Sequence, residues 1–167
     1  MMNIELCKET DIELLEQEIP SPGQSKFHIG RMRMQKEGTA SYLIAWNGEK
    51  PVGHLLIKWD GFGPVMPESL KNIPELNSFE VAENTRGKGI GTSLIKAAED
   101  LAIQKGVKTI GLLVNPDNLR AKLLYERLGY HDSGTGIYTD KWEAYDDDGN
   151  QFIDSEACLA MIKNLTD

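Results

Sequence analysis

The stretch Arg86-Gly87-Lys88-Gly89-Ile90-Gly91-Thr92 says most about the fold of this chain. It follows a strand-like segment, residues 78–82, and opens a segment in which Ile90, Leu94 and Leu101 recur at helical spacing. A strand, a glycine-rich turn and a helix in this order place unpaired backbone N–H groups at the positive end of the helix. Three alternating glycines with two cations beside them therefore predict a phosphate-binding loop.

Two common phosphate-binding loops do not fit this stretch. A P-loop needs G-x-x-x-x-G-K-[ST], whereas Lys88 lies between two glycines and no Lys-Ser/Thr pair closes the loop. A dinucleotide-binding turn needs G-x-G-x-x-G, and here G-x-G-x-G follows Arg86. A glycine-rich turn that only joins a strand to a helix is the plain alternative.

The loop instead resembles the acetyl-CoA signature of the GNAT family of N-acetyltransferases, often written R/Q-x-x-G-x-G/A. The matching pattern runs from Val81 through Arg86 to Gly91. The stretch Asn118-x-x-Ala121-x-x-x-Tyr125-x-x-x-Gly129-Tyr130 is similar to the family's other motif, N-x-x-A-x-x-L-Y-x-x-x-G-F/Y. The two motifs occur in the family's order and cover residues 78–130, so the match is specific.

The resemblance implies an α/β fold of the α+β type, with a single N-acetyltransferase domain over residues 1–167. Its mixed, mostly antiparallel sheet would have about seven strands, flanked by about four helices. A chain of 167 residues with 40% hydrophobic and 26% charged residues suits one soluble domain. One departure is Glu83, which stands where the family commonly has a proline that shapes the strand exit and carries no chemistry.

Periodicity, turn residues and helix-capping residues predict the remaining elements. Strands are expected at residues 4–7, 41–46, 51–59, 109–114, 137–144 and 157–165, and helices at residues 12–19, 25–37 and 119–128. Strands 78–82 and 109–114 should lie parallel and adjacent, because a helix between two strands forms a right-handed crossover. The glycine loop then opens at the carboxyl end of the first of them, where open α/β sheets bind ligands.

Several connections also carry expectations. Thr10 or Asp11 would cap the first helix, and Pro22-Gly23 would form a turn after it. Residues 60–75 form a long irregular connection that either shapes a binding site or is a surface excursion. Residues 146–150, Asp-Asp-Asp-Gly-Asn, are expected to be a polar turn, because an EF-hand would place Ala and Ser at ligand positions.

The net charge of −8 is distributed unevenly along the chain. Residues 1–130 contain 17 acidic and 16 basic side chains, whereas residues 131–167 contain 9 acidic and 2 basic ones. A nucleic-acid-binding protein would be biased toward basic residues, so that class is disfavoured. The acidic end serves either solubility or the attraction of a cationic acceptor.

The chain contains two cysteines, Cys7 and Cys158, far apart and without metal-ligand spacing. Together with a start that lacks the layout of a signal peptide and the absence of a long apolar run, they predict a cytoplasmic protein. We expect no metal site, no membrane association and no disulfide, since the family sheet keeps the first and last strands apart.

The resemblance also implies how acetyl-CoA would bind as a cosubstrate. Its pyrophosphate would meet the N–H groups of residues 86–92, and its pantetheine arm would pair with the backbone near Val81. Asn118 would hydrogen-bond the pantetheine region. In the family, the acceptor amine attacks the thioester directly in a ternary complex, without an acyl-enzyme.

Two proton transfers then need side chains. A lysine-like amine with a pKa of ~10.4 must lose a proton before it attacks, and the departing thiolate gains from a proton donor. Tyr125 suits the second task. Glu80 is the candidate base for the first, because strand alternation turns it away from Phe79 and Val81, although it could instead only attract the cationic amine. His54 is a lesser candidate, and His28 and His131 have no predicted partners.

The sequence thus predicts an acetyl-CoA-dependent N-acetyltransferase that acts on a primary amine of a small molecule or peptide. A non-catalytic CoA-binding or sensing module of the same fold is the alternative, and Tyr125 favours the enzyme over it. A nucleotide-binding protein is a weaker third class, because Walker and ribose-binding residues are missing. The identity of the acceptor and the presence of a homodimer stay open.

Overall fold

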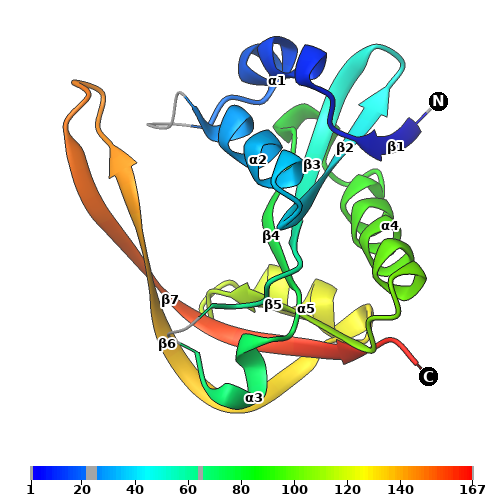
Figure 1. Cartoon of the computed structure of the whole chain (residues 1–167), viewed down its shortest axis with the longest axis vertical. Coiled ribbons are helices and arrows are strands. Elements are labelled where there is room, and N and C mark those ends of the chain that lie inside the picture. Colours follow the sequence, from blue (N-terminus) through cyan, green and yellow to red (C-terminus); the bar gives the residue numbers. More distant parts are fainter. Residues whose placement is uncertain (1, 22–25, 64–65, 167) are drawn as a thin grey trace.

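The computed structural model describes residues 2–21, 26–63 and 66–166. Seven strands, five α-helices and two short 3-10 helices follow one another in this part of the chain (Figure 1). In order they are β1 (Met2–Leu6), η1 (Glu9–Asp11), α1 (Ile12–Glu18), α2 (Phe27–Lys36), β2 (Ala40–Asn47), β3 (Lys50–Lys58), α3 (Glu68–Lys71), β4 (Glu75–Val81), η2 (Glu83–Thr85), α4 (Ile90–Gln104), β5 (Thr109–Val114), α5 (Leu119–Arg127), β6 (His131–Tyr145) and β7 (Gln151–Asn164).

The seven strands form one mixed sheet in the order β1-β2-β3-β4-β5-β7-β6. Every neighbouring pair is antiparallel except β4 and β5, which are parallel. The predicted sheet and the predicted pairing of its two parallel strands are therefore confirmed. The helices number five rather than about four, because the connection at residues 60–75 contains the single-turn helix α3.

The parallel strands β4 and β5 stay together for a short distance only. Their registered pairs are Glu75↔Gly111 and Leu76↔Leu112, whereas β4 remains paired with β3 as far as Val81. Ser78, between these regions, has a φ of 52° and is the only described non-glycine residue with a positive φ. The register between β3 and β4 shifts close to it. A residue in this conformation bends the strand, so β4 turns away from β5 and a space opens between them.

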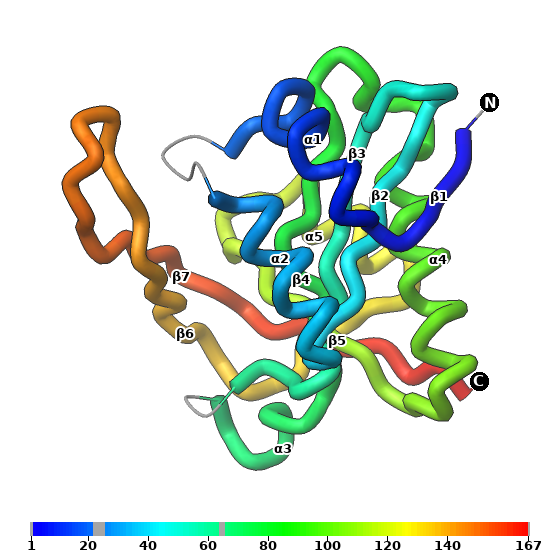
Figure 2. The backbone as a smooth tube through the Cα atoms, turned by 45° about the horizontal axis from the view of Figure 1, so that its top comes forward, coloured from blue at the N-terminus to red at the C-terminus, as the bar shows by residue number. Residues whose placement is uncertain are grey.

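Each face of the sheet is covered by different helices, which Figure 2 shows on either side of β3. On one face, the apolar side of α4 packs on inward-facing strand residues such as Leu55 and Ile57. On the other face, Tyr42, Ile44 and Leu56 pack with Leu15 of α1. Residues that alternate along β3 thus enter two separate cores, which is why this strand reads as a continuous apolar run.

The described part of the 60–75 connection packs its apolar side chains onto the sheet while several of its polar residues are exposed. Phe62, Met66 and Leu70 form a small core with Ala160 of β7. A Cβ on Gly111 would lie 2.7 Å from the ring of Phe62, so this ring requires glycine on β5. The connection therefore covers the sheet near β5 and β7.

The last two strands are much longer than the predicted segments 137–144 and 157–165. β6 and β7 pair from Tyr145↔Gln151 to His131↔Ile162, with a register shift between Asp132 and Ile137 where two glycines have positive φ. Their distal part, residues 137–157, projects from the body as a two-stranded ribbon (Figures 1 and 2). We call this ribbon the C-terminal arm. Its polar residues weakened the strand signal in the sequence.

Smaller predictions had mixed outcomes. The polar turn at residues 146–150 is confirmed, because Asp146 Oδ1 accepts the N–H groups of Asp148 and Asn150. Asp11, one of the two predicted candidates, is the N-cap residue of α1, but its carboxylate makes no cap hydrogen bond to this helix and instead accepts the N–H of Lys8 at 2.8 Å. The predicted Pro22-Gly23 turn and the Ser25 helix start lie outside the described residues.

The two cysteines are both buried and free. Cys7 follows β1 at one edge of the sheet, and Cys158 lies on β7, with four strands between these two. Neighbouring strands are ~4.8 Å apart, whereas a disulfide needs Cα atoms within ~7 Å. The strand order on which the disulfide prediction rested is therefore the observed one.

Candidate active site

Each glycine of the 86–92 loop is needed for a structural reason of its own. Gly87 and Gly89 have φ values of 82° and 79°, in the left-handed region that favours glycine. Gly89 is the N-cap of α4, and no side chain caps the helix there. Gly91 has ordinary backbone angles, but a Cβ on it would lie 2.9 Å from the ring of Phe79. The first turn of α4 thus presents its N–H groups beside three positions that carry no side chain.

This loop, the end of β4 and one side of α5 enclose a pocket of about 460 Å³. Of the eleven predicted site residues, ten line it and Lys88 does not. The ten are Glu80, Val81, Arg86, Gly87, Gly89, Ile90, Gly91, Thr92, Asn118 and Tyr125. Arg120 and Arg127 of α5 also line this pocket. The sequence analysis did not predict these two residues. Their signal was two cations seven residues apart, hence on one face of the helix that Asn118 caps.

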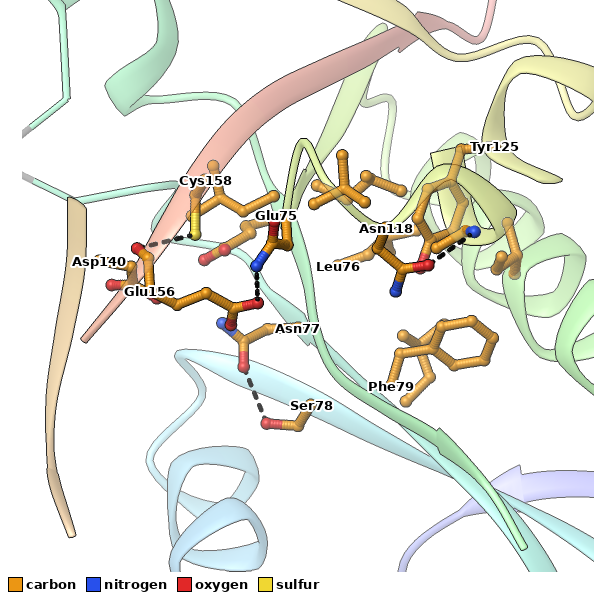
Figure 3. A pocket seen from close by; sticks show the side chains of 17 residues that line it. Glu75, Leu76, Asn77, Ser78, Phe79, Asn118, Tyr125, Asp140, Glu156 and Cys158 are labelled. Carbon is orange, nitrogen blue, oxygen red and sulfur yellow. Dashed lines mark hydrogen bonds between the residues drawn. The ribbon is translucent and has the colours of Figure 1, made fainter. Parts of the chain in front are cut away.

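A second pocket of about 330 Å³ occupies the space where β4 and β5 diverge. Figure 3 shows Tyr125 and Phe79 at one end of it, Asp140, Glu156 and Cys158 at the other, and Asn118 between them. Because Phe79, Asn118 and Tyr125 line both pockets, the two spaces meet at these side chains. A long ligand in the first pocket can therefore present its end to a second molecule in the other.

Asn118 has two tasks at this junction. Its Oδ1 accepts the N–H of Ala121 at 3.1 Å and so caps α5. Its amide nitrogen points into the second pocket (Figure 3). The cap fixes the side chain, so the amide N–H group is held ready for a carbonyl oxygen of a ligand.

Tyr125 is partly buried on α5, with its ring edge-on to that of Tyr130 at 6.3 Å between centroids. Burial raises the pKa of Tyr125, so its hydroxyl keeps its proton at neutral pH. Within residues 2–21, 26–63 and 66–166 this hydroxyl has no hydrogen-bond partner, whereas that of Tyr130 donates to Glu99 at 2.8 Å. The Tyr125 hydroxyl is therefore a proton donor that is free to contact a ligand.

Glu80 lies on the other face of β4 from Phe79 and Val81. The two apolar side chains pack in the core beneath α4, beside Gly91, as strand alternation predicted. The Glu80 carboxylate instead lies 3.5 Å from Nε2 of the buried His54, its register partner on β3. The His54 ring lowers the pKa of Glu80, while burial opposes this shift. Glu80 is thus charged at neutral pH on the face away from α4.

Three carboxylates from different elements line the second pocket: Glu75, Asp140 and Glu156. Burial raises the pKa of Glu75 to about 7, although Lys58 Nζ lies 3.6 Å away. Glu156 Oε1 accepts a hydrogen bond from Asn115 at 2.9 Å. The sequence reading placed the acidic excess at residues 131–167 but could not place two of its members beside β4.

The other two histidines differ from each other. His28, for which no partner was predicted, is fully buried and hydrogen-bonded on both ring nitrogens. His131 is exposed at the start of β6. In the described part of the chain no three His, Cys, Asp or Glu side chains are grouped to hold a metal ion. No helix there is both long and apolar enough to cross a membrane.

The sequence model of the acetyltransferase (GNAT) family matches residues 7–130. The chain belongs to this family. It is 41% identical over 64 residues to the uncharacterized N-acetyltransferase YhfO of Bacillus subtilis, an alignment that covers 38% of this chain and 43% of YhfO. The chain spans less than half the length of each curated relative that it matches.

Solved structures with low sequence identity share the fold. The ribosomal-protein-S18-alanine N-acetyltransferase of Escherichia coli superposes with a TM-score of 0.70 at 19% identity, covering 100% of this chain and 96% of that one. The PaiA N-acetyltransferase of Thermoplasma acidophilum, in complex with coenzyme A, gives 0.67 at 17% identity, covering 98% and 99%. These likenesses confirm the architecture. Because both identities are low, they show the fold alone.

Proposed function

We propose that this chain is an acetyl-CoA-dependent N-acetyltransferase that transfers an acetyl group to a primary amine. The observation that carries the proposal is the junction of two pockets at Phe79, Asn118 and Tyr125. One pocket has a loop and cations suited to phosphates, and the other has carboxylates suited to an amine. A thioester at the junction would lie within reach of both.

The first pocket fits coenzyme A at its phosphates. Backbone N–H groups at the start of α4 point toward an anion, and Arg86, Arg120 and Arg127 add positive charge around the same space. Beyond the phosphates, the strand edge of β4 that β5 does not pair offers backbone groups to the pantetheine amides. The Asn118 amide nitrogen is placed for one further hydrogen bond there.

Two side chains would carry the proton transfers. Tyr125 gives its hydroxyl proton to the CoA sulfur as the C–S bond breaks, which avoids the release of a free thiolate, and the second proton that the acetylated nitrogen loses restores the hydroxyl. Glu80, on the other side of the strand, takes a proton from the acceptor ammonium so that the nitrogen lone pair can attack the thioester carbon. The attack is direct, in a ternary complex, and the chain forms no covalent intermediate.

The acceptor is proposed to be cationic beyond its reacting nitrogen. Glu75, Asp140 and Glu156 line the pocket from which the amine would arrive, and Lys58 pairs with the first of them. A second ammonium or guanidinium group on the acceptor would offset this negative charge. Small polyamines, aminoglycosides and peptides with basic residues share this property.

The proposal is tested by release of CoA thiol against a panel of mono- and polycationic amines, together with calorimetry of CoA and ATP binding. We expect CoA to bind, ATP not to compete, and polycationic amines to give the higher kcat/KM. CoA binding without thiol release from any amine would support the alternative, a non-catalytic CoA-binding module. Failure to bind CoA would overturn the assignment of the cosubstrate.

A further inference from the structure

Two buried histidines lie side by side beneath Glu80, yet their hydrogen bonding differs. His28 of α2 and His54 of β3 are 0% and 1% exposed, and their ring centroids are 5.1 Å apart. His28 Nε2 lies 2.7 Å from the carbonyl oxygen of Ile19, and its Nδ1 lies 2.6 Å from the hydroxyl of Tyr42. A carbonyl only accepts, so Nε2 carries the proton and Nδ1 accepts from the hydroxyl. His28 is thus complete as a neutral ring, in agreement with a pKa lowered by burial.

His54 is not complete in the same way. Its Nδ1 lies 2.7 Å from the carbonyl oxygen of Ser78, so this nitrogen must carry a proton. In a neutral ring the lone pair of Nε2 would then face Glu80 Oε2, 3.5 Å away. In the described part of the chain, Nε2 is the only buried side-chain N or O atom without a hydrogen-bond partner. A lone pair and a carboxylate repel each other, and one proton between them removes the repulsion.

We propose that His54 and Glu80 act together as one proton acceptor, so that the proton of the acceptor ammonium is shared by this pair rather than taken by the Glu80 carboxylate alone. The inference rests on the proposed function. The ammonium N–H bond breaks toward the Glu80 carboxylate, the proton comes to lie between Oε2 and Nε2, and the nitrogen keeps the electron pair with which it attacks. The pair later returns the proton to solvent through the carboxylate, which is partly exposed. Glu80 touches the substrate, and His54 acts through it.

A lone carboxylate is a weak base toward an ammonium group, and the pair would bind the proton more tightly. An ordinary imidazole binds a proton about two pH units more tightly than an ordinary carboxylate, and so is a better match for an ammonium group. The lowered pKa of Glu80 agrees with a proton that stays nearer to the imidazole. Since both strand partners are fixed by the β3–β4 register, the pair needs no rearrangement to accept the proton.

Other charged and titratable groups face this pair from each neighbouring element. From α2, Arg31 donates to the Ser78 hydroxyl at 3.0 Å, and its guanidinium lowers the pKa of His28. Arg86 lies near Glu80 in the loop before α4 and lowers its pKa. From α1, Glu16 accepts the N–H of His28 at 3.1 Å and favours positive charge. Tyr42 of β2 contributes only its hydroxyl.

The test is His54→Asn, with His28→Gln as matched control. Asparagine can still donate to the Ser78 carbonyl but has nothing in place of Nε2, whereas glutamine can replace the His28 donor to Ile19. We expect His54→Asn to lower kcat about tenfold or more and to move the acidic limb of the kcat/KM–pH profile to lower pH, toward an isolated carboxylate. His28→Gln should leave that limb in place, and CoA affinity should be unchanged in both variants.

A second measurement does not depend on turnover. NMR titration of the histidine rings should show His54 titrating at lower pH in Glu80→Gln than in the native protein, with His28 neutral in both. An unchanged His54 titration, or an unchanged acidic limb in a folded His54→Asn enzyme, would overturn the pair. If the titrations are coupled but no amine releases thiol, the pair stands and the proposed function fails.

Discussion

The region of residues 75–130, which forms the proposed CoA site, and the C-terminal arm contrast in how they use their residues. In the first, single positions have strict geometric roles, as Gly91 beneath Phe79 and Asn118 at the start of α5 illustrate. In the arm, side chains face solvent on both sides, and Ile137 and Ile153 are 65% and 63% exposed. Ligand binding by backbone groups tolerates few substitutions beside them, whereas ligand binding by charge attraction weakens gradually as charges are removed. Changes of the same kind made in both regions should therefore differ in effect.

The largest contrast should come from the removal of one hydroxyl group. Tyr125→Phe keeps the ring but removes the proposed donor to the thiolate, so we expect kcat to fall by about 10²–10⁴-fold at unchanged CoA affinity. The same change in Tyr138 of the arm removes only a hydrogen bond to the Thr135 carbonyl and should leave kcat as it is. Steady-state kinetics with chemistry shown to be rate-limiting would measure both. Full kcat in Tyr125→Phe would exclude the tyrosine from the mechanism.

Removal of a carboxylate should change stability differently in the buried wall of the second pocket and in the arm. The folded-state pKa of Glu75 is about 7 against 4.5 in the unfolded chain, so this group favours folding fully below pH 4.5 and loses the effect as pH rises through 7. Glu75→Gln removes the penalty, and its stability relative to the native protein should rise by roughly 3 kcal/mol between pH 4 and pH 8.

Glu156→Gln on the exposed part of β7 is the matched control, because it removes a carboxylate that faces solvent rather than one that is buried. Urea unfolding of both variants at the two pH values would measure the difference. A gain in Glu75→Gln that does not change with pH would show that the carboxyl is not held protonated by burial.

Two glycines permit a comparison of the same backbone strain in the two regions. Gly89 of the loop and Gly149 of the arm turn have φ values of 79° and 84°, and a Cβ on either would meet nothing within 4 Å. Valine at each position should cost about 1–2 kcal/mol of stability, because both glycines have a left-handed backbone conformation. Only Gly89→Val places a side chain where the pyrophosphate is proposed to lie, so only it should weaken CoA binding, by about tenfold or more. Calorimetry that finds equal CoA affinities would contradict the loop assignment.

The smallest effect is expected from charges on the arm. Asp140→Asn with Glu156→Gln removes two carboxylates from the second pocket, whereas Asp147→Asn with Asp148→Asn removes two from the tip. Exposed charge pairs contribute about 0.5 kcal/mol each, so KM for a polycationic amine should rise about fivefold in the first variant, which lacks two charges. The tip variant should change KM little. Equal changes, or a KM that does not respond to salt, would argue against direct attraction at the pocket.

The parts of the site that could be predicted from sequence are those where local geometry restricts the residue type. A left-handed turn before a helix favours glycine, and a helix start favours a capping side chain, so the 86–92 loop and Asn118 were recognisable. The His54–Glu80 contact was not, because it depends on the register of two strands and joins residues 26 positions apart. The length of the arm was missed for another reason: its exposed polar strands lack the apolar alternation of a strand on a core.

The divergence of β4 from β5 also bears on how an unpaired strand edge is kept away from other chains. A strand edge with unpaired N–H and C=O groups normally invites another chain to add to the sheet, and an outer edge must be guarded against that. Here such an edge lies in the middle of the sheet, between two walls that belong to the same molecule. A partner must be as narrow as a single extended chain to reach it, which excludes the face of a second sheet. The cleft that would select a slender ligand thus also keeps the unpaired edge of β4 out of reach of another sheet.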